Sequence, residues 1–227
     1  MQLTDLRHNF DPARFACFVG LYLKAFPNFD EREDPSIWPS QLQSEPSADQ
    51  PVFHILLAIS ERDTIQGAVV YEYYQNTSAG LLTYLLVADE TRGQGLARRL
   101  IDAARLGLHH EAELHGRRLT GIFAEAEDPE KYNAGPTEFD PTLRRQIFGR
   151  LGAANTGVPY VQPKLTSGSE RCRHLDLLCF PLKSGRPAEV DPITTIQFLH
   201  EFYCGLGVTN PEADIDWRLM SDHLHQQ

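Results

Sequence analysis

The chain has 227 residues, of which 41% are hydrophobic and 23% charged, as is ordinary for one large globular domain or two small ones. Its 21 basic and 31 acidic residues give a formal net charge of -10, which argues against nucleic acid or an anionic membrane surface as the main partner, because both need clustered Lys and Arg. Residues 30–50 and 125–140 each hold six acids and one base, so these two segments account for the whole imbalance.

The compartment is predicted from what the sequence lacks. The start, MQLTDLRHNF, has no apolar region of the kind found in a signal peptide, and no apolar run approaches the length of a membrane span. The four cysteines (Cys17, Cys172, Cys179 and Cys204) show no C-x2-C spacing. We therefore expect a soluble cytoplasmic protein with buried or idle thiols.

The first half of the chain predicts a helix followed by a three-stranded meander. Asp11 suits a helix N-cap with Pro12 at the first position, and Pro27 ends the helix after Phe26. The acidic, proline-rich stretch 30–50 predicts a loop or short helix. Residues 53–59, 65–74 and 81–87 are rich in strand formers and are joined by short polar turns, which indicates antiparallel pairing.

The second half predicts alternating helices and strands. A helix follows Gly95 to about residue 115, and a strand over 119–126 is expected to pair in parallel with 81–87 through this helical crossover. A helix over 140–151, strands over 158–165 and 174–182, and a helix over 192–204 complete the order.

The expected fold class is a mixed α/β domain with a central, mostly antiparallel sheet flanked by helices. This domain covers residues 1–183. A C-terminal helical extension, 184–227, is expected to pack on the same domain or on a partner subunit in a homodimer, and the sequence leaves both arrangements open.

One turn between a strand and a helix carries a recognisable chemical pattern. Glycines at the start of a helix let backbone N–H groups approach a ligand, and the helix dipole adds partial positive charge, which suits a pyrophosphate. The turn is neither a G-K-[ST] phosphate loop nor a G-x-G-x-x-G fingerprint. It comprises Arg92, Gly93, Gln94, Gly95, Leu96 and Ala97.

This R-x-x-G-x-A turn, after a strand ending Leu-Leu-Val, resembles the acetyl-CoA-binding motif of the GNAT superfamily of N-acetyltransferases. The resemblance implies that Leu85, Leu86 and Val87 bind the pantetheine arm of acetyl-CoA and that the amides of Arg92 to Ala97 hold its pyrophosphate. It implies further that strands 81–87 and 119–126 splay apart at the acyl group. Asn133 loosely resembles the pantetheine-contacting asparagine of the family.

The catalytic acid departs from the family pattern. Phe148 stands where many members carry a tyrosine that protonates the leaving thiolate, and phenylalanine has no proton to give. Either another group is the acid, with Tyr132 and Tyr160 the nearest candidates, or the CoA thiol leaves unassisted. Packing is the alternative role for Tyr160.

The general base is open as well. Glu125 and Glu127 lie at the end of the strand that faces the acyl site, and their spacing puts both side chains on one face. A solvated loop mouth is the alternative interpretation of this pair. Glu72 and Tyr84 are further candidates in the cleft strands, with packing the alternative for Tyr84. His54, in an apolar strand, is expected to be a core histidine.

The sequence therefore predicts an acetyl-CoA-dependent N-acetyltransferase acting on a primary amine of a small molecule or peptide, with no metal. The alternative is a non-catalytic acyl-CoA-binding sensor or accessory module on the same fold. In this superfamily both acidic segments border the acceptor side of the cleft, so a cationic amine is the expected acceptor. An acidic surface that serves only solubility is the competing interpretation.

Overall fold

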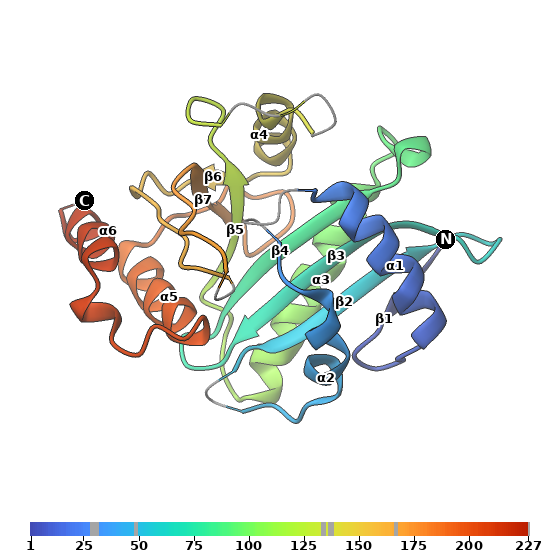
Figure 1. Cartoon of the computed structure of the whole chain (residues 1–227), viewed down its shortest axis with the longest axis horizontal. Helices are drawn as coiled ribbons and strands as arrows, with labels where there is room; N and C mark the ends of the chain where they lie inside the picture. Colours follow the sequence, from blue (N-terminus) through green and yellow to red (C-terminus); the bar gives the residue numbers. More distant parts are fainter. Residues whose placement is uncertain (28–31, 48–49, 133–134, 136–138, 166–167, 227) are drawn as a thin grey trace.

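The computed structural model describes residues 1–27, 32–47, 50–132, 135, 139–165 and 168–226. Seven strands form one sheet in the order β1-β2-β3-β4-β5-β7-β6, and all neighbours are antiparallel except β4 and β5 (Figure 1). The strands are β1 Gln2–Asp5, β2 Val52–Ile59, β3 Ile65–Tyr74, β4 Ala79–Val87, β5 Gly121–Glu127, β6 Ala154–Asn155 and β7 Leu175–Phe180. The α-helices are α1 Pro12–Ala25, α2 Trp38–Gln43, α3 Leu96–Leu114, α4 Pro141–Arg150, α5 Pro192–Gly205 and α6 Ile215–His225, with 3-10 turns η2 Pro35–Ile37, η3 Asp89–Thr91 and η4 Pro211–Ala213.

Elements with local signals confirm the sequence predictions. The Asp11 carboxylate accepts hydrogen bonds from the first amides of α1, and Asp140 does the same for α4, because these amides have no carbonyl partner inside their helix. Gly152 ends α4 with a φ of 95°, a conformation that favours glycine. The β2–β3–β4 meander and the parallel β4–β5 pair are also present.

The prediction of a strand over 158–165 is wrong. Pro159 and Pro163 interrupt that stretch, and proline cannot donate to a strand ladder. The segment is buried but irregular, with an isolated bridge between Gln162 and Cys172. The two-residue strand β6 pairs with β7 in its place.

Two elements have no counterpart in the sequence prediction. β1 is a short N-terminal edge strand antiparallel to β2. α6 lies in the polar tail, for which the sequence pattern predicts no helix, and the side chain of Asp214 caps it. Its buried residues Met220 and Leu224 are too few to stand out from the polar residues around them.

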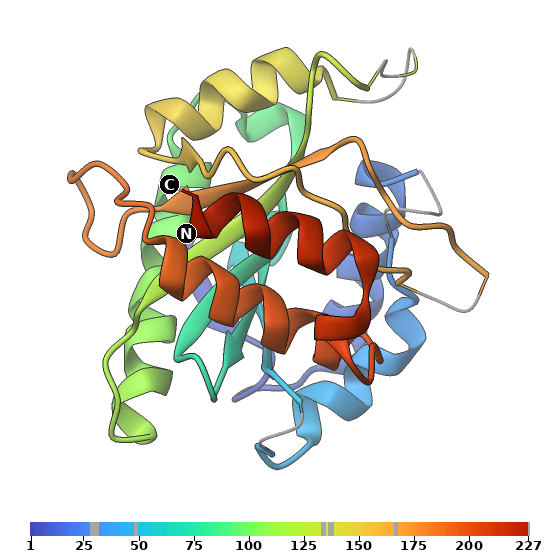
Figure 2. The same cartoon turned by 90° about the vertical axis from the view of Figure 1, so that its left-hand side faces the viewer.

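Helices cover both faces of the sheet. α3 packs on one face against β2 to β5, while α1 and α2 pack on the other face against β2 to β4. α5 and α6 lie side by side on the same face as α1 and α2, against the other half of the sheet (Figure 2). The C-terminal extension thus shares a hydrophobic core with strands β3, β4, β5 and β7. Within the described residues, no helix combines the length and apolar character needed to cross a bilayer.

Candidate active site

The parallel strands β4 and β5 separate halfway along β4. Their ladder joins Ala79–Leu82 to Gly121–Ala124 and continues no further in the described chain. β4 runs on to Val87 while still paired with β3 on its other edge. The edge of β4 from Thr83 to Val87 is therefore open to an added strand-like ligand, which is the splay that the family resemblance implied.

The turn between β4 and α3 has the geometry of an anion cradle. Gly93 and Gly95 have φ values of 76° and 77°, and a Cβ at either position would meet no atom within 4 Å. The reason for glycine at both positions is therefore the left-handed backbone conformation, and not a lack of room for a side chain. Gly95 precedes the first turn of α3, whose amides have no partner inside the helix and point outward at its positive end.

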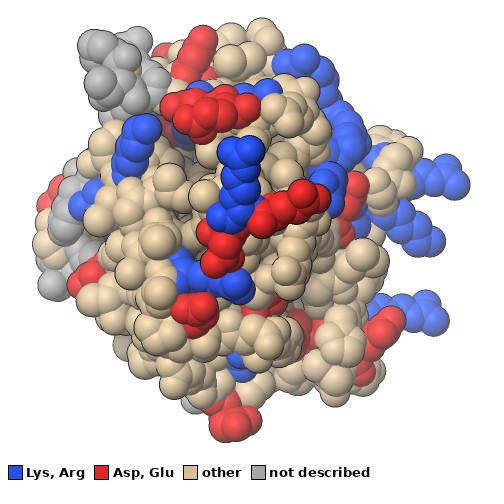
Figure 3. All heavy atoms as spheres, turned by 90° about the vertical axis from the view of Figure 1, so that its right-hand side faces the viewer, with Lys and Arg blue, Asp and Glu red and all other residues tan. Residues whose placement is uncertain are grey.

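Arginine side chains surround this turn. Arg92 pairs with Asp89 at 2.8 Å, and its Nε donates to the Val87 carbonyl at 3.4 Å. Arg98 donates to the carbonyl of Arg150 at 2.9 Å, and Arg99 is exposed nearby on α3. On the face that carries α1 and η3, Lys and Arg side chains project along one edge and charges of both signs alternate over the middle (Figure 3). Asn133 lies outside the described residues.

A cavity of about 520 Å³ opens on the face opposite α3. Phe26 and Ile37 line it on the side of α1 and α2, and Phe202 and Gly205 line it on the side of α5. Its lining includes five carboxylates but, within the part of the chain that the structure describes, a single basic side chain, Arg144. The carboxylates belong to Glu33, Asp34, Glu72, Glu125 and Glu127.

Glu125 and Glu127 share the cavity but have different partners. Glu125 is the first residue of β5 beyond the β4–β5 ladder, and its Oε1 accepts hydrogen bonds from the Tyr160 hydroxyl and from Gln162 Nε2, the latter at 2.8 Å. Glu127 forms an ion pair with Arg144. The predicted common face of the two glutamates is thus present, since both line the cavity.

Two further carboxylates in the cavity are held by neutral donors. Trp38 Nε1 donates to Glu33 Oε2 at 2.9 Å, and the Tyr74 hydroxyl donates to Glu72 Oε2 at 2.6 Å. Burial raises the pKa of Glu33. Burial and the nearby negative charge of Glu33 raise the pKa of Glu72 to about 8, because both disfavour its charged form.

The tyrosines named from the sequence occupy distinct positions. Tyr84 lines the cavity within a ring cluster that includes Tyr22 and Trp38, and its hydroxyl accepts from the Glu33 amide at 3.1 Å. The Tyr160 hydroxyl contacts the cavity indirectly, because it donates a hydrogen bond to Glu125, which is a lining residue. Burial raises the pKa of both hydroxyls well above the usual range, so both keep their protons.

Tyr132, the other candidate acid, and Phe148, at the position of the usual tyrosine, both pack on aromatic rings. The Tyr132 ring stacks on His174 with centroids 4.6 Å apart. Phe148 packs edge-on against Phe180 at 5.5 Å and contributes to the core on the α3 side of the sheet.

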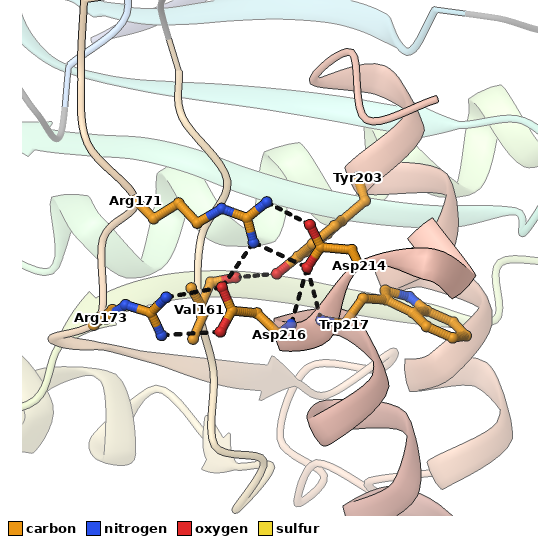
Figure 4. A network of polar contacts seen from close by, with 7 residues as sticks. All are labelled: Val161, Arg171, Arg173, Tyr203, Asp214, Asp216 and Trp217. Carbon is orange, nitrogen blue, oxygen red and sulfur yellow. Dashed lines mark hydrogen bonds and ion pairs between the residues drawn. The ribbon is translucent and has the colours of Figure 1, made fainter. Parts of the chain in front are cut away.

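The C-terminal extension supports the residues that hold Glu125, a relation that sequence reasoning missed. The Tyr203 hydroxyl of α5 donates to the Val161 carbonyl at 2.5 Å, between Tyr160 and Gln162 in the chain (Figure 4). Around it, Arg171 and Arg173 pair with two aspartates at the start of α6, Asp214 and Asp216, and several of these bonds are drawn in Figure 4. No local signal marks Tyr203, because its partner is a backbone carbonyl 42 residues away.

His54 is buried, as expected for a core histidine. Its Nδ1 lies 2.8 Å from Asp5, its Nε2 lies 3.2 Å from Glu111, and its ring stacks on Tyr71 with centroids 4.5 Å apart. Asp5, His8 and His54 offer possible metal ligands within 4.8 Å of one another, but both nitrogens of His54 already face carboxylates. The cluster is therefore best described as an ion network between β1, β2 and α3.

Comparisons with known proteins identify the fold. No protein-family model matches the chain, and no curated protein matches it. Among solved structures, a Bacteroides thetaiotaomicron protein assigned to the GNAT acetyltransferase family aligns with a TM-score of 0.62 and 15% identity, over 92% of this chain and 100% of that one. A GNAT-family acetyltransferase from Staphylococcus aureus aligns at 0.53 and 14%, over 80% and 100%. The ribosomal-protein-S18-alanine N-acetyltransferase of Escherichia coli aligns at 0.50 and 10%, over 82% and 97%. The mixed sheet, its splayed parallel pair and these likenesses together show that the chain has the fold of the GNAT acetyltransferases.

Proposed function

We propose that this protein transfers an acetyl group from acetyl-CoA to a primary amine of a small molecule or peptide. The observation that carries the proposal is the arrangement around the split between β4 and β5. A turn suited to a pyrophosphate lies beyond the end of β4, and a cavity rich in carboxylates opens where the two strands part. An anionic cofactor and a cationic acceptor would thus approach from opposite sides.

The cofactor side is assigned to the residues that the motif predicts. The open edge at Leu85, Leu86 and Val87 would bind the pantetheine arm as an added strand. The amides from Arg92 to Ala97 would hold the pyrophosphate at the start of α3. This path would bring the thioester to the point where the strands part, beside Thr83 and Glu125.

The acceptor side supplies the base. An ammonium group entering the cavity would lose a proton to Glu125, and the neutral nitrogen would attack the thioester carbonyl carbon. A C–N bond forms and the C–S bond breaks, and the CoA thiolate leaves without an acid, as its moderate pKa permits; it takes up the second proton, which the nitrogen loses as the amide forms. Backbone N–H groups of β4 past Leu82 would stabilise the negative charge that develops on the carbonyl oxygen.

The remaining candidates receive supporting roles in this proposal. Glu127 is held by Arg144, and this ion pair stabilises its charged carboxylate and so lowers its basicity. Tyr160 is a positioning residue that acts through Glu125, and Tyr84 positions the segment that carries Glu33. The acidic lining supports a cationic acceptor, for which KM should rise with salt.

The cofactor assignment is tested with Gly95→Asp. This change strains a left-handed backbone position and adds a negative charge at the expected pyrophosphate site, so acetyl-CoA binding measured by calorimetry should be lost. Gly185→Asp is the matched control, because Gly185 also has positive φ, at 75°, would place a Cβ in open space, and lies in the 183–187 loop. Equal binding by wild type and Gly95→Asp would overturn the assignment.

Turnover is tested by release of free CoA thiol with a panel of primary amines. Thiol release that depends on the amine supports the enzyme. Acetyl-CoA binding without thiol release from any amine would instead identify the accessory or sensor module, which the packed Phe148 at the position of the usual tyrosine favours.

A further inference from the structure

The cavity contains more acidic side chains than basic ones that could pair with them. Arg144 is the only basic side chain in the lining that the structure describes, and it pairs with Glu127. Glu33 and Glu72 receive hydrogen bonds from neutral groups, the Trp38 indole and the Tyr74 hydroxyl. Neither the buried Glu72 nor the half-buried Glu33 has a Lys or Arg within ion-pair distance among the described residues, although carboxylates removed from water are usually paired.

A second observation, independent of charge, points to a donor-rich ligand in the same cavity. Gln162 lines the cavity and is 4% exposed. Its Nε2 donates to Glu125, which fixes the orientation of the amide and leaves Oε1 as an acceptor. No described residue donates to this Oε1, nor to the buried Oγ1 of Thr83, another lining residue. Unfilled buried acceptors are uncommon, because each is costly to leave without a donor.

The positions of the groups divide the cavity into two parts. Thr83 and Glu125 are the first residues of their strands beyond the β4–β5 ladder, where the thioester is expected. Glu72 lies opposite Leu81, within the stretch of β4 that still pairs with β5, and its charge interacts first with that of Glu33 and more weakly with that of Glu125. Glu72 is therefore set back along the sheet from the expected reaction point, and Glu33 lines the same cavity beside it, within electrostatic reach.

We propose that the natural acceptor is a small molecule with two ammonium groups, a diamine or a short polyamine. One amino group reacts beside Glu125, Thr83 and Gln162, and the second stays protonated in a subsite formed by Glu33 and Glu72. The inference rests on the proposed acetyl transfer and deepens it by naming the substrate class. A cavity of about 520 Å³ is in the size range of small-molecule sites.

An ammonium group fits the second subsite better than a neutral group of the same size. It carries three N–H donors and a positive charge, whereas a hydroxyl has one donor and no charge. Between buried partners, a charge-assisted hydrogen bond is about twice as strong as a neutral one. Replacing the distal ammonium by a hydroxyl leaves the two carboxylates without a positive partner. This cost is larger than the loss of hydrogen-bond strength alone.

The experiment compares α,ω-diamines, from 1,3-diaminopropane to 1,6-diaminohexane, with the amino alcohol of the same chain length. We expect kcat/KM for the best diamine to exceed that of its amino alcohol roughly thirtyfold or more. Glu33→Gln and Glu72→Gln keep an acceptor for Trp38 and Tyr74 but remove the charge, so each should narrow this ratio to a few-fold. Glu61→Gln, in the exposed β2–β3 turn, should keep the wild-type ratio.

The ratio of the two kcat/KM values is taken within each variant. A smaller fraction of folded protein lowers both values equally and therefore does not change the ratio. Equal kcat/KM for diamines and amino alcohols would overturn the second subsite and leave the acetyl transfer standing. No thiol release with any amine would overturn the proposed function. In that case calorimetric titration of wild type decides the inference, because a diamine that binds no more tightly than its amino alcohol would overturn it.

Discussion

Two groups of acidic side chains lie on opposite faces of the same sheet, and they differ in one respect. On the α3 face, His54 lies between Asp5 and Glu111. Although burial opposes ionisation there, hydrogen bonds within the group raise the pKa of His54 and lower those of both acids, so the three groups stabilise one another's charged forms. On the other face, Glu33 and Glu72 have no such partner among the described residues, and their pKa values are raised.

This difference separates a structural role from a functional one. The compensated group ties β1, β2 and α3 together and needs no ligand. The uncompensated group raises the free energy of the folded chain until a cation arrives, as is common for groups that bind or react. Consecutive residues on each strand serve the two faces, since His54 faces Tyr71 across the ladder while Phe53 faces Glu72.

The largest expected effect concerns the base at the functional face. Glu125→Gln keeps hydrogen-bonding capacity toward Tyr160 and Gln162 but removes the proton acceptor, so kcat should fall about 10²-fold or more. Acetyl-CoA affinity, measured by calorimetry, should stay near that of wild type. A kcat within a few-fold of wild type at saturating amine would remove Glu125 from the base role.

The second effect concerns the structural face. His54→Ala leaves Asp5 and Glu111 buried without their cation, so the free energy of unfolding in denaturant should fall by about 3–5 kcal/mol. His110→Ala, an exposed change on the same helix as Glu111, should cost far less.

The pH dependence of that loss follows from the signs of the shifts. The raised pKa of His54 gives stability that is complete below its usual 6.5 and is lost as pH rises through the folded value. The lowered pKa values of Asp5 and Glu111 give stability present above their usual 3.8 and 4.5 and lost at lower pH. The difference between wild type and His54→Ala should peak between these limits, and a difference that grows steadily toward pH 9 would contradict the network.

A smaller effect of opposite sign is expected for Glu72→Gln. A carboxyl whose pKa rises from 4.5 to about 8 on folding reduces the stability of the ligand-free protein as pH rises through that window. The amide variant avoids this, so without ligand it should be more stable than wild type at pH 9, by about 1–3 kcal/mol. Thermal unfolding of both proteins at pH 5 and pH 9 measures the gain, and a less stable variant at pH 9 would contradict the buried charge.

The smallest effect tests whether the C-terminal extension supports the site. Tyr203→Phe removes the hydrogen bond to Val161, with an expected cost of about 1 kcal/mol in unfolding free energy. Because Val161 lies between Tyr160 and Gln162, kcat should also fall a few-fold while acetyl-CoA affinity stays unchanged. Tyr73→Phe, which removes a buried hydroxyl hydrogen bond to Ser78 on the α3 face, is the matched change elsewhere, and equal kcat losses in both variants would argue against a specific role for the extension.

Elements with short-range determinants were predictable from the sequence. The caps of α1 and α4, the meander and the glycine turn before α3 each depend on residues a few positions apart, such as Asp140 with the two amides that follow Pro141. The parallel pairing of β4 and β5 followed from the single helical crossover between them, whereas the family resemblance implied that the two strands splay apart. The prediction failed at 158–165, where strand-forming residues predicted a strand but two prolines prevent a regular strand ladder.

The sequence by itself thus determined the order of the elements from α1 to α4, the glycine turn before α3 and the place of Glu125 and Glu127 at the end of β5. Only the tertiary structure decided which carboxylates form an ion pair with a basic side chain. Glu127 meets Arg144, whereas Glu72 meets Tyr74 on its own strand and the charge of Glu33 from a distant loop. The physical reason is that burial and charge compensation depend on neighbours brought together from α1 to α5, and no local pattern records that encounter.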